Sequence, residues 1–179
     1  CGKSTLLSII AGLLPAEDGT ILVNNPDGSL HYPRVGYMLQ REHLFEWRSI
    51  YKNVILGLEI NHMLTPERLE YVDSLLRDYD LEKFKDKRPS ELSGGMKQRA
   101  ALIRTLALEP QHLLLDEPFS ALDYQTRLFV SADICRLIRA AGKTMVIITH
   151  DLSEAISLAD RIIVLSGRPA VVKNEVAVK

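Results

Sequence analysis

The sequence predicts an α/β fold in which helices flank a mostly parallel sheet, with an all-helical lobe inserted into the core. Three observations support this prediction. Short apolar strands alternate with helical segments, which is typical of a parallel sheet. The strands are apolar enough to be covered on both faces. Residues 40–91 are instead nearly all helix and loop, so we expect residues 1–39 and 92–179 to form the core and about 40–91 the lobe.

The composition is that of a single globular domain. The chain has 179 residues, enough to bury a core, of which 46% are hydrophobic and 25% charged. The net charge of −1 gives no indication of nucleic-acid binding. No apolar run approaches the roughly 18 residues that a membrane-spanning helix needs. Cys1 and Cys135 lack metal-ligand spacing, which favours a reducing, cytosolic compartment.

The N-terminal part is predicted to contain one helix and two strands. The helix covers residues 3–11, because a glycine and a proline end its pattern. A short strand over 20–23 follows, and then a turn over 24–28 that contains Asn, Pro and Gly. The apolar run over 35–39 predicts a buried strand that leads directly into Gln40.

The lobe is predicted to begin with a loop over 41–49 and a helix over 50–58. Thr65 opens a second helix, because a capping residue followed by proline is a typical helix start. A short helical turn over 81–84 follows it. The apolar residues of the second helix recur at helical spacing and are Leu69, Val72, Leu75 and Leu76.

In the C-terminal part, helices and strands alternate, and the first two helices are ended by a proline and a glycine. The predicted helices cover 95–108, 124–141 and 152–159. The predicted strands cover 113–115, 145–148, 162–165 and the alternating segment 171–179.

The first chemical motif is Gly2-Lys3-Ser4-Thr5, at the start of the first helix. Glycine allows the backbone to approach a phosphate closely, and Lys3 supplies a cationic point charge. The helix N-terminus directs N–H groups and a partial positive charge to the same place. The Ser4 hydroxyl suits Mg²⁺. Taken alone, a capped surface helix explains this motif equally well.

Asp116 and Glu117 form the second motif, at the end of the strand over 113–115. Ligands of parallel sheets bind at the carboxyl ends of the strands. There Asp116 can hold Mg²⁺, and Glu117 can orient or deprotonate a water molecule that attacks a γ-phosphate. Two solvated acids before Pro118 are the simpler alternative, but apolar strands rarely end in this way by chance.

The third motif, Ser93-Gly94-Gly95, precedes a helix rich in Lys, Gln and Arg. The Ser93 hydroxyl and the helix N-terminus together can bind an anionic group. A serine that only caps the helix explains the same residues.

Together these motifs resemble ATP-binding cassette (ABC) ATPases, which have a P-loop NTPase-type fold. The resemblance covers nearly the whole chain, and the motifs occur in the family's order, so chance is a remote explanation. The matching segments are the end of Walker A at 1–5, the Q-loop at Gln40, the signature loop at 92–98, Walker B with its catalytic glutamate at 113–117, the D-loop at 120–123 and the switch histidine at His150.

The resemblance implies how ATP and Mg²⁺ would be bound within one subunit. Lys3 would neutralise the β- and γ-phosphates, and its neighbours in the Gly2-to-Thr5 motif would bind the same phosphate tail. Ser4 and Asp116 would hold Mg²⁺. Gln40 would be a further contact to the metal or to the attacking water.

The resemblance also implies a catalytic role for Glu117, as general base, and for His150, as a contact to the γ-phosphate. Ser93, Gly94 and Gly95 would reach the nucleotide of the opposite subunit in a head-to-tail dimer. Asp123 would couple the two sites of that dimer.

In the cell, the resemblance implies the ATPase subunit of a membrane importer. It would be a peripheral protein at the cytoplasmic face of the membrane and would act on transmembrane permease subunits, with an extracytoplasmic solute-binding protein as an indirect partner. No nucleic-acid partner is expected. Residues 53–59 and Trp47 resemble the nitrate, sulfonate and taurine importer branch. Trp47 is therefore expected to contact the permease.

Two alternatives remain open at this point. A soluble ABC-class ATPase of DNA repair or translation usually carries long coiled-coil insertions or duplicated cassettes, and neither is seen in the sequence. The second alternative is a nucleotide-binding module that is inactive because its glycine-rich loop is truncated. The chain begins inside a motif and without Met, so we expect it to be part of a longer domain and to bind ATP poorly in isolation.

Overall fold

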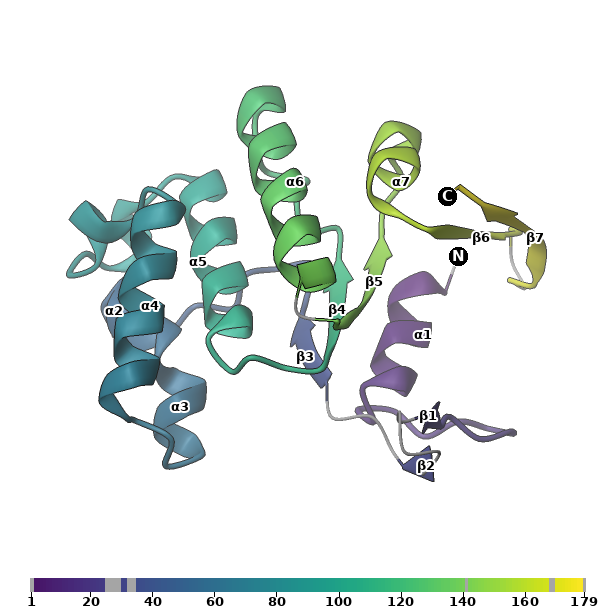
Figure 1. Cartoon of the computed structure of the whole chain (residues 1–179), viewed down its shortest axis with the longest axis horizontal. Coiled ribbons are helices and arrows are strands. Elements are labelled where there is room, and N and C mark those ends of the chain that lie inside the picture. The colour runs from purple at the N-terminus through teal and green to yellow at the C-terminus, as the bar shows by residue number, and fades with distance from the viewer. Residues whose placement is uncertain (1, 25–29, 32–34, 141, 168–169, 179) are drawn as a thin grey trace.

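A three-stranded parallel sheet forms the centre of the computed structural model, which describes residues 2–24, 30–31, 35–140, 142–167 and 170–178. The strands lie in the order β3 (Val35–Met38), β4 (His112–Asp116) and β5 (Thr144–Ile148). Met38 pairs with Leu115, and Leu115 pairs with Ile147, so all three strands end at one edge of the sheet (Figure 1). The predicted parallel α/β core is confirmed.

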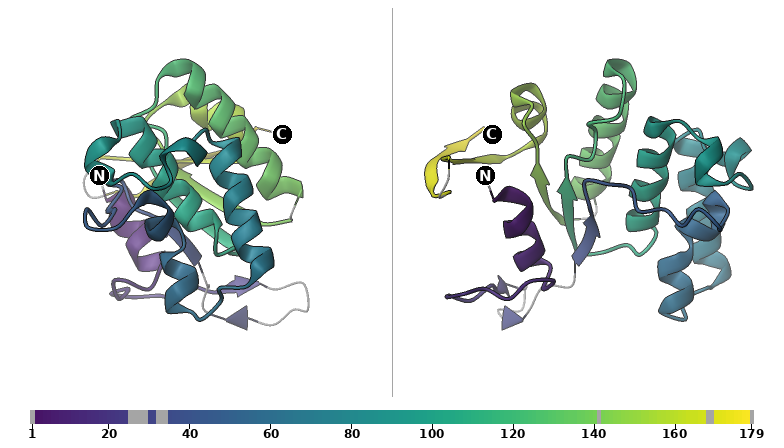
Figure 2. Two further views of the ribbon diagram at one scale, coloured as in Figure 1. Left: turned by 90° about the vertical axis from the view of Figure 1, so that its left-hand side faces the viewer. Right: turned by 180° about the vertical axis from the view of Figure 1, so that it is seen from behind.

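The two faces of the sheet are covered by different helices, which lie on opposite sides of β4 and β5 (Figures 1 and 2). Leu114 packs with Leu7 of α1 (Lys3–Ile10) on one face. Leu113 and Leu115 belong to the larger core on the other face, which α5 (Gly94–Leu106) and α6 (Tyr124–Ala140) cover. This alternation follows because successive side chains of a strand point to opposite faces.

The inserted lobe packs on α5, away from α1 (Figure 1). It consists of α2 (Ile50–Val54), α3 (Leu56–Ile60), α4 (Pro66–Asp78) and two short 3₁₀ turns, η1 (Glu82–Phe84) and η2 (Pro89–Glu91).

The helix predicted over 50–58 is instead two helices. The chain turns at Ile55, which lies in neither helix and has a φ of −80° and a ψ of −1°. Just beyond this bend, Gly57 lies so close to Leu108 that a Cβ on Gly57 would be 2.9 Å from its Cδ1. A larger residue at position 57 would displace the Leu108 side chain, and glycine is itself a weak helix former.

The predicted helix start at Thr65 is confirmed in atomic detail, whereas the helix predicted over 95–108 begins one residue earlier and ends at Leu106. The Thr65 hydroxyl accepts a hydrogen bond from the N–H of Arg68, with Pro66 in the first helical position. The Ser93 hydroxyl accepts one from the N–H of Met96, and α5 therefore begins at Gly94. Such caps satisfy N–H groups that have no partner inside the helix.

The remaining strands form two antiparallel ribbons. The strand predicted over 20–23 is shifted, since β1 covers Val23–Asn24 and pairs with β2 (Leu30–His31). Asn24 thus lies in a strand, and the rest of the predicted turn is outside the described residues. After α7 (Leu152–Leu158), β6 (Arg161–Leu165) pairs with β7 (Val172–Ala177). Among the described helices, none is long and apolar enough to span a bilayer.

Candidate active site

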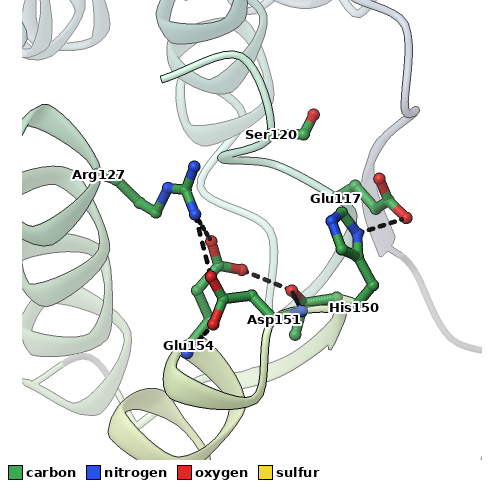
Figure 3. A pocket seen from close by; sticks show the side chains of 7 residues that line it. Glu117, Ser120, Arg127, His150, Asp151 and Glu154 are labelled. Atoms are coloured by element: carbon green, nitrogen blue, oxygen red, sulfur yellow. Dashed lines mark hydrogen bonds and ion pairs between the residues drawn. The ribbon is translucent and has the colours of Figure 1, made fainter. Parts of the chain in front are cut away.

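Gln40, Glu117 and His150 meet at the edge where the parallel strands end. Gln40 follows β3, Glu117 follows β4 and His150 follows β5. The Glu117 carboxylate is approached by both of the other side chains. His150 Nδ1 is 3.2 Å from Glu117 Oε1, and Gln40 Nε2 donates to Oε2 at 3.5 Å. Figure 3 shows the contact of His150 with Glu117.

Glu117 has an unusual backbone for this position. Its φ is 49°, in the left-handed region that non-glycine residues rarely adopt. Its N–H donates to the carbonyl of Ile148 at 2.9 Å, at the end of β5. Such a conformation costs on the order of 1–3 kcal/mol and persists only where the surroundings impose it, as they commonly do at active sites.

Gln98 holds the loop that follows Glu117, although α5 is distant in sequence from that loop. Its side chain is 2% exposed. Its Nε2 donates to the Glu117 carbonyl at 3.2 Å, and its Oε1 accepts from the N–H of Ala121 at 3.0 Å. A third contact, at 3.4 Å, joins Nε2 to the Ser120 hydroxyl. The turn that carries Glu117 is therefore fixed by a buried amide.

The loop after β5 is fixed by its own polar residues. Asp151 caps α7, since its Oδ1 accepts from the N–H groups of Ser153 and Glu154. The bond from Glu154 is the main cause that keeps the pKa of Asp151 below its usual value, with further contributions from Ser153, Arg127 and His150 against an opposing effect of burial.

A cavity of about 50 Å³ lies between this loop, the loop after β4 and α6 (Figure 3). Glu117, Ser120 and His150 contribute to its lining. The cavity is large enough for water molecules but too small for a nucleotide.

The Gly2-to-Thr5 motif lies at the same edge of the sheet. Gly2 adopts a φ of 93° before α1, a conformation that glycine tolerates. The N-terminal end of α1 is level with the ends of β4 and β5 (Figure 1), and Leu7 of α1 packs near Ile148. The first turn, with Lys3 and Ser4, thus directs the positive end of the helix dipole to this edge.

Ser93, Gly94 and Asp123 lie outside this cluster. In the part of the chain that the structure describes, no hydrogen bond or ion pair joins any of them to Glu117. Ser93 and Gly94 are exposed at the start of α5. Gly95 lies against the loop before α6, where a Cβ would be 3.3 Å from the Ala121 carbonyl oxygen. Asp123 accepts from the N–H of Thr126 at 3.0 Å, and hydrogen bonds from Thr126 hold its pKa below the usual range.

The residues at the edge suit Mg²⁺ chemically. Ser4, Asp116 and Gln40 offer oxygen atoms, which this cation prefers. Asp116, the last residue of β4, is only 3% exposed. A nearby cation would offset the cost of burying its charge. Among the described residues, no three His, Cys, Asp or Glu side chains are grouped as a metal site, so a site here depends on hydroxyl, amide and phosphate oxygens as well.

Reasoning from the sequence missed the residues that hold the site together. The sequence identified Gln98 only as part of the signature loop. Its spacing from Ala101 and Leu102 nevertheless places it on an apolar face of the helix, where an amide indicates a buried polar contact. The start of α7 at residue 152 was predicted, but the capping role of Asp151 was not, although the spacing of Asp151 and Glu154 matches a helix cap.

The parallel sheet, the inserted lobe and the polar cluster at the strand ends define a P-loop NTPase-type cassette. A family model described as ABC transporter matches residues 1–120, more than half of the chain. The chain belongs to the ABC transporter family.

Relatives and solved structures agree with this assignment. An uncharacterized ABC transporter ATP-binding protein of Bacillus subtilis, YtlC, is 48% identical over 172 residues, which are 96% of this chain and 66% of that protein. The taurine import ATP-binding protein TauB of a Jannaschia species is 41% identical over 177 residues, which are 98% of this chain and 65% of that protein. The chain thus spans about two thirds of the length of these relatives.

The fold is also similar to that of the ATP-binding cassette MJ0796, in a dimeric post-hydrolysis state bound to ADP and Pi. The TM-score is 0.85 at 29% sequence identity, and the match covers 99% of this chain and 81% of that one.

Proposed function

We propose that this chain is the ATP-hydrolysing part of an ABC importer. The observation that carries the proposal is the meeting of Gln40, Glu117 and His150 at the carboxyl ends of three parallel strands. A carboxylate held between an amide and an imidazole is suited to orient a water molecule and to take its proton.

Each residue at this edge of the sheet then has its own role in ATP hydrolysis. Lys3 and the N-terminus of α1 bind the phosphate tail, and His150 contacts the γ-phosphate. Glu117 accepts a proton from water as the water oxygen attacks the γ-phosphorus. The bond between that phosphorus and the oxygen bridging to the β-phosphate breaks, which gives ADP and phosphate.

Mg²⁺, held by Ser4 and Asp116 with Gln40 nearby, would neutralise charge on the phosphates. Gln40 keeps the Glu117 side chain in place through its amide N–H.

A second copy of the chain completes each site in this proposal. Ser93 and Gly94 are exposed at the start of an α-helix, and their position within the chain leaves them open to another molecule. Their N–H groups and the helix dipole would bind the phosphates held by the other copy. The dimeric state of the MJ0796 cassette supports this arrangement.

The lobe offers a surface for a transmembrane permease, close to Gln40. Trp47 is 73% exposed and lies beside Phe45, with 4.7 Å between the ring centroids. Asn53 is fully buried below this loop, accepting from the N–H of Phe45 and donating to its carbonyl. Exposed aromatic side chains on a loop that is fixed from below are suited to a protein partner.

The TauB relatives support an importer for a small sulfonate, taurine or nitrate-like solute. An extracytoplasmic binding protein would deliver that solute to the permease. The chain itself would then be peripheral, on the cytoplasmic face of the membrane.

The test is phosphate release from ATP by the full-length protein, with and without Glu117→Gln. The amide keeps the size of the side chain but takes no proton, so we expect kcat to fall by about 10²–10⁴-fold while ATP binding persists. Glu70→Gln, on an exposed position of α4, is the matched control and should keep the wild-type rate. Equal rates for Glu117→Gln and Glu70→Gln would contradict the assignment of the base.

A further inference from the structure

Arg127, near the start of α6, joins two loops that carry proposed site residues. Its Nη2 donates to the carbonyl of Leu122 at 3.3 Å, in the loop that leads to α6. Its Nη1 lies 3.1 Å from Asp151 Oδ2 and 3.4 Å from Glu154 Oε1, at the start of α7 (Figure 3). The side chain is 26% exposed and Glu154 is 10% exposed, so solvent screens these contacts less than those of a surface ion pair.

The residues that Arg127 binds determine where His150 lies. The Thr149 hydroxyl donates to Glu154 Oε2 at 2.6 Å and accepts from the N–H of Asp151 at 3.0 Å. His150 lies between Thr149 and Asp151 in the chain, and its own side chain is 71% exposed. The backbone on either side, rather than packing around the imidazole, therefore sets its distance to Glu117.

On the other loop, Arg127 holds the carbonyl of Leu122, directly before Asp123. Asp123 caps α6, and Arg127 belongs to the same helix, since its N–H donates to the Asp123 carbonyl at 2.9 Å. One guanidinium thus connects the Asp123 loop with the His150 loop.

We infer that Arg127 is a positioning residue for the hydrolysis reaction, which fixes the His150 loop relative to the Asp123 loop. The inference rests on the proposed function. Three acceptors from two loops need donors that diverge from one planar group, and guanidinium provides them. A lysine keeps the charge but is a single point charge, and it cannot reach all three acceptors in the same way.

The experiment measures kcat and KM for ATP with the full-length protein and two Arg127 variants. Arg127→Gln should lower kcat by about tenfold or more and change KM by less than about twofold, because Lys3 and the N-terminus of α1, which bind most of the phosphate tail in the proposed function, are untouched. Arg127→Lys should give an intermediate kcat. Melting temperatures are recorded for each variant, so that a loss of folded protein is separated from a loss of rate.

Arg139→Gln is the matched control on the same helix. Arg139 also joins α6 to the end of α7, through the Leu158 carbonyl at 3.4 Å and Asp160 Oδ1 at 2.8 Å, but it is far along the helix from His150. Its replacement should keep kcat near the wild-type value even if the melting temperature falls.

A double variant tests whether Arg127 acts through His150. In a His150→Ala background, Arg127→Gln should lower kcat by less than about twofold further, because the residue that it positions is gone. Additive losses, or equal kcat values for Arg127→Gln and Arg139→Gln, would overturn the inference and leave the proposed function intact. A wild-type protein that releases no phosphate would instead contradict the proposed function, and the inference with it.

Discussion

At the scale of single residues, Gln98 is the amide on which the catalytic loop depends. It is buried, and its two amide atoms bind the Glu117 carbonyl and the Ala121 N–H. A hydrocarbon side chain of similar length would fill the space but leave both backbone groups without their partner. The loss of these hydrogen bonds is the reason that this residue is expected to be sensitive.

We predict that Gln98→Met lowers the free energy of unfolding by about 1 kcal/mol, because the Glu117 carbonyl and the Ala121 N–H lose their hydrogen bonds to the amide. Urea denaturation of the full-length protein measures this change. Gln125→Met, at an exposed position of α6, should leave the unfolding free energy nearly unchanged. Equal midpoints of urea denaturation for the two variants would show that the Gln98 amide does not stabilise the loop after Glu117.

The sequence was enough to single out Glu117, because an acid pair at the end of an apolar strand has few simple explanations. It was not enough to place Gln40 and His150 against its two carboxylate oxygens. Those contacts depend on the register of strands far apart in the chain and on the left-handed φ of Glu117, which no local pattern encodes.

At the scale of elements, α6 and α7 begin with aspartates that cap them, Asp123 and Asp151. Hydrogen bonds from Thr126 and from the N–H of Glu154 lower the respective pKa values. A folded-state pKa below the unfolded value of about 3.9 means that the contribution to stability is present above that pH and is lost as pH falls through the folded pKa.

We therefore predict that the Asp123→Asn, Asp151→Asn double variant unfolds with a weaker pH dependence than the wild type between about pH 5 and pH 3. Asparagine remains a good cap, so the helices should persist at neutral pH. Urea denaturation at a series of pH values measures the slope. Identical slopes would show that these caps do not contribute to acid sensitivity.

Helix and strand positions were largely predictable, because glycine, proline and capping residues punctuate the sequence. The start of α4 at Thr65 is the clearest case, since capping chemistry is local. The division of the helix at Ile55 was not predictable, because it accompanies a tertiary contact between Gly57 and Leu108. The antiparallel pairing of β6 with β7 was missed for a similar reason, because the residues of a strand do not specify which other strand it pairs with.

At the scale of the whole molecule, the aromatic loop with Phe45 and Trp47 follows Gln40 of the active site along the chain. Arg104 of α5 donates to the carbonyls of Glu42 and His43, and so ties the first part of this loop to the core. A movement of Glu42 and His43 would therefore be transmitted to the helix that also carries Gln98. In the proposed importer, this contact would help a permease to sense the state of the nucleotide.

We predict that Trp47→Ala lowers ATP hydrolysis coupled to transport by the assembled transporter in vesicles about tenfold, by removing a central aromatic contact. Phosphate release by the isolated subunit should be retained. Phe129→Ala removes another exposed aromatic, on α6, and should leave both activities unchanged. Equal loss of both activities in the Trp47 variant would contradict a coupling role.

The central claim is that one ATP is bound between Lys3 of one copy and Ser93 of another. Phosphate release by mixtures of two inactive full-length variants, Lys3→Ala and Ser93→Arg, tests it most directly. Each variant alone should be inactive, while the mixture forms heterodimers with one intact site and recovers up to about a quarter of the wild-type rate. A mixture that stays inactive although the two variants associate would contradict the claim, as would a Ser93→Arg variant that hydrolyses ATP at the wild-type rate.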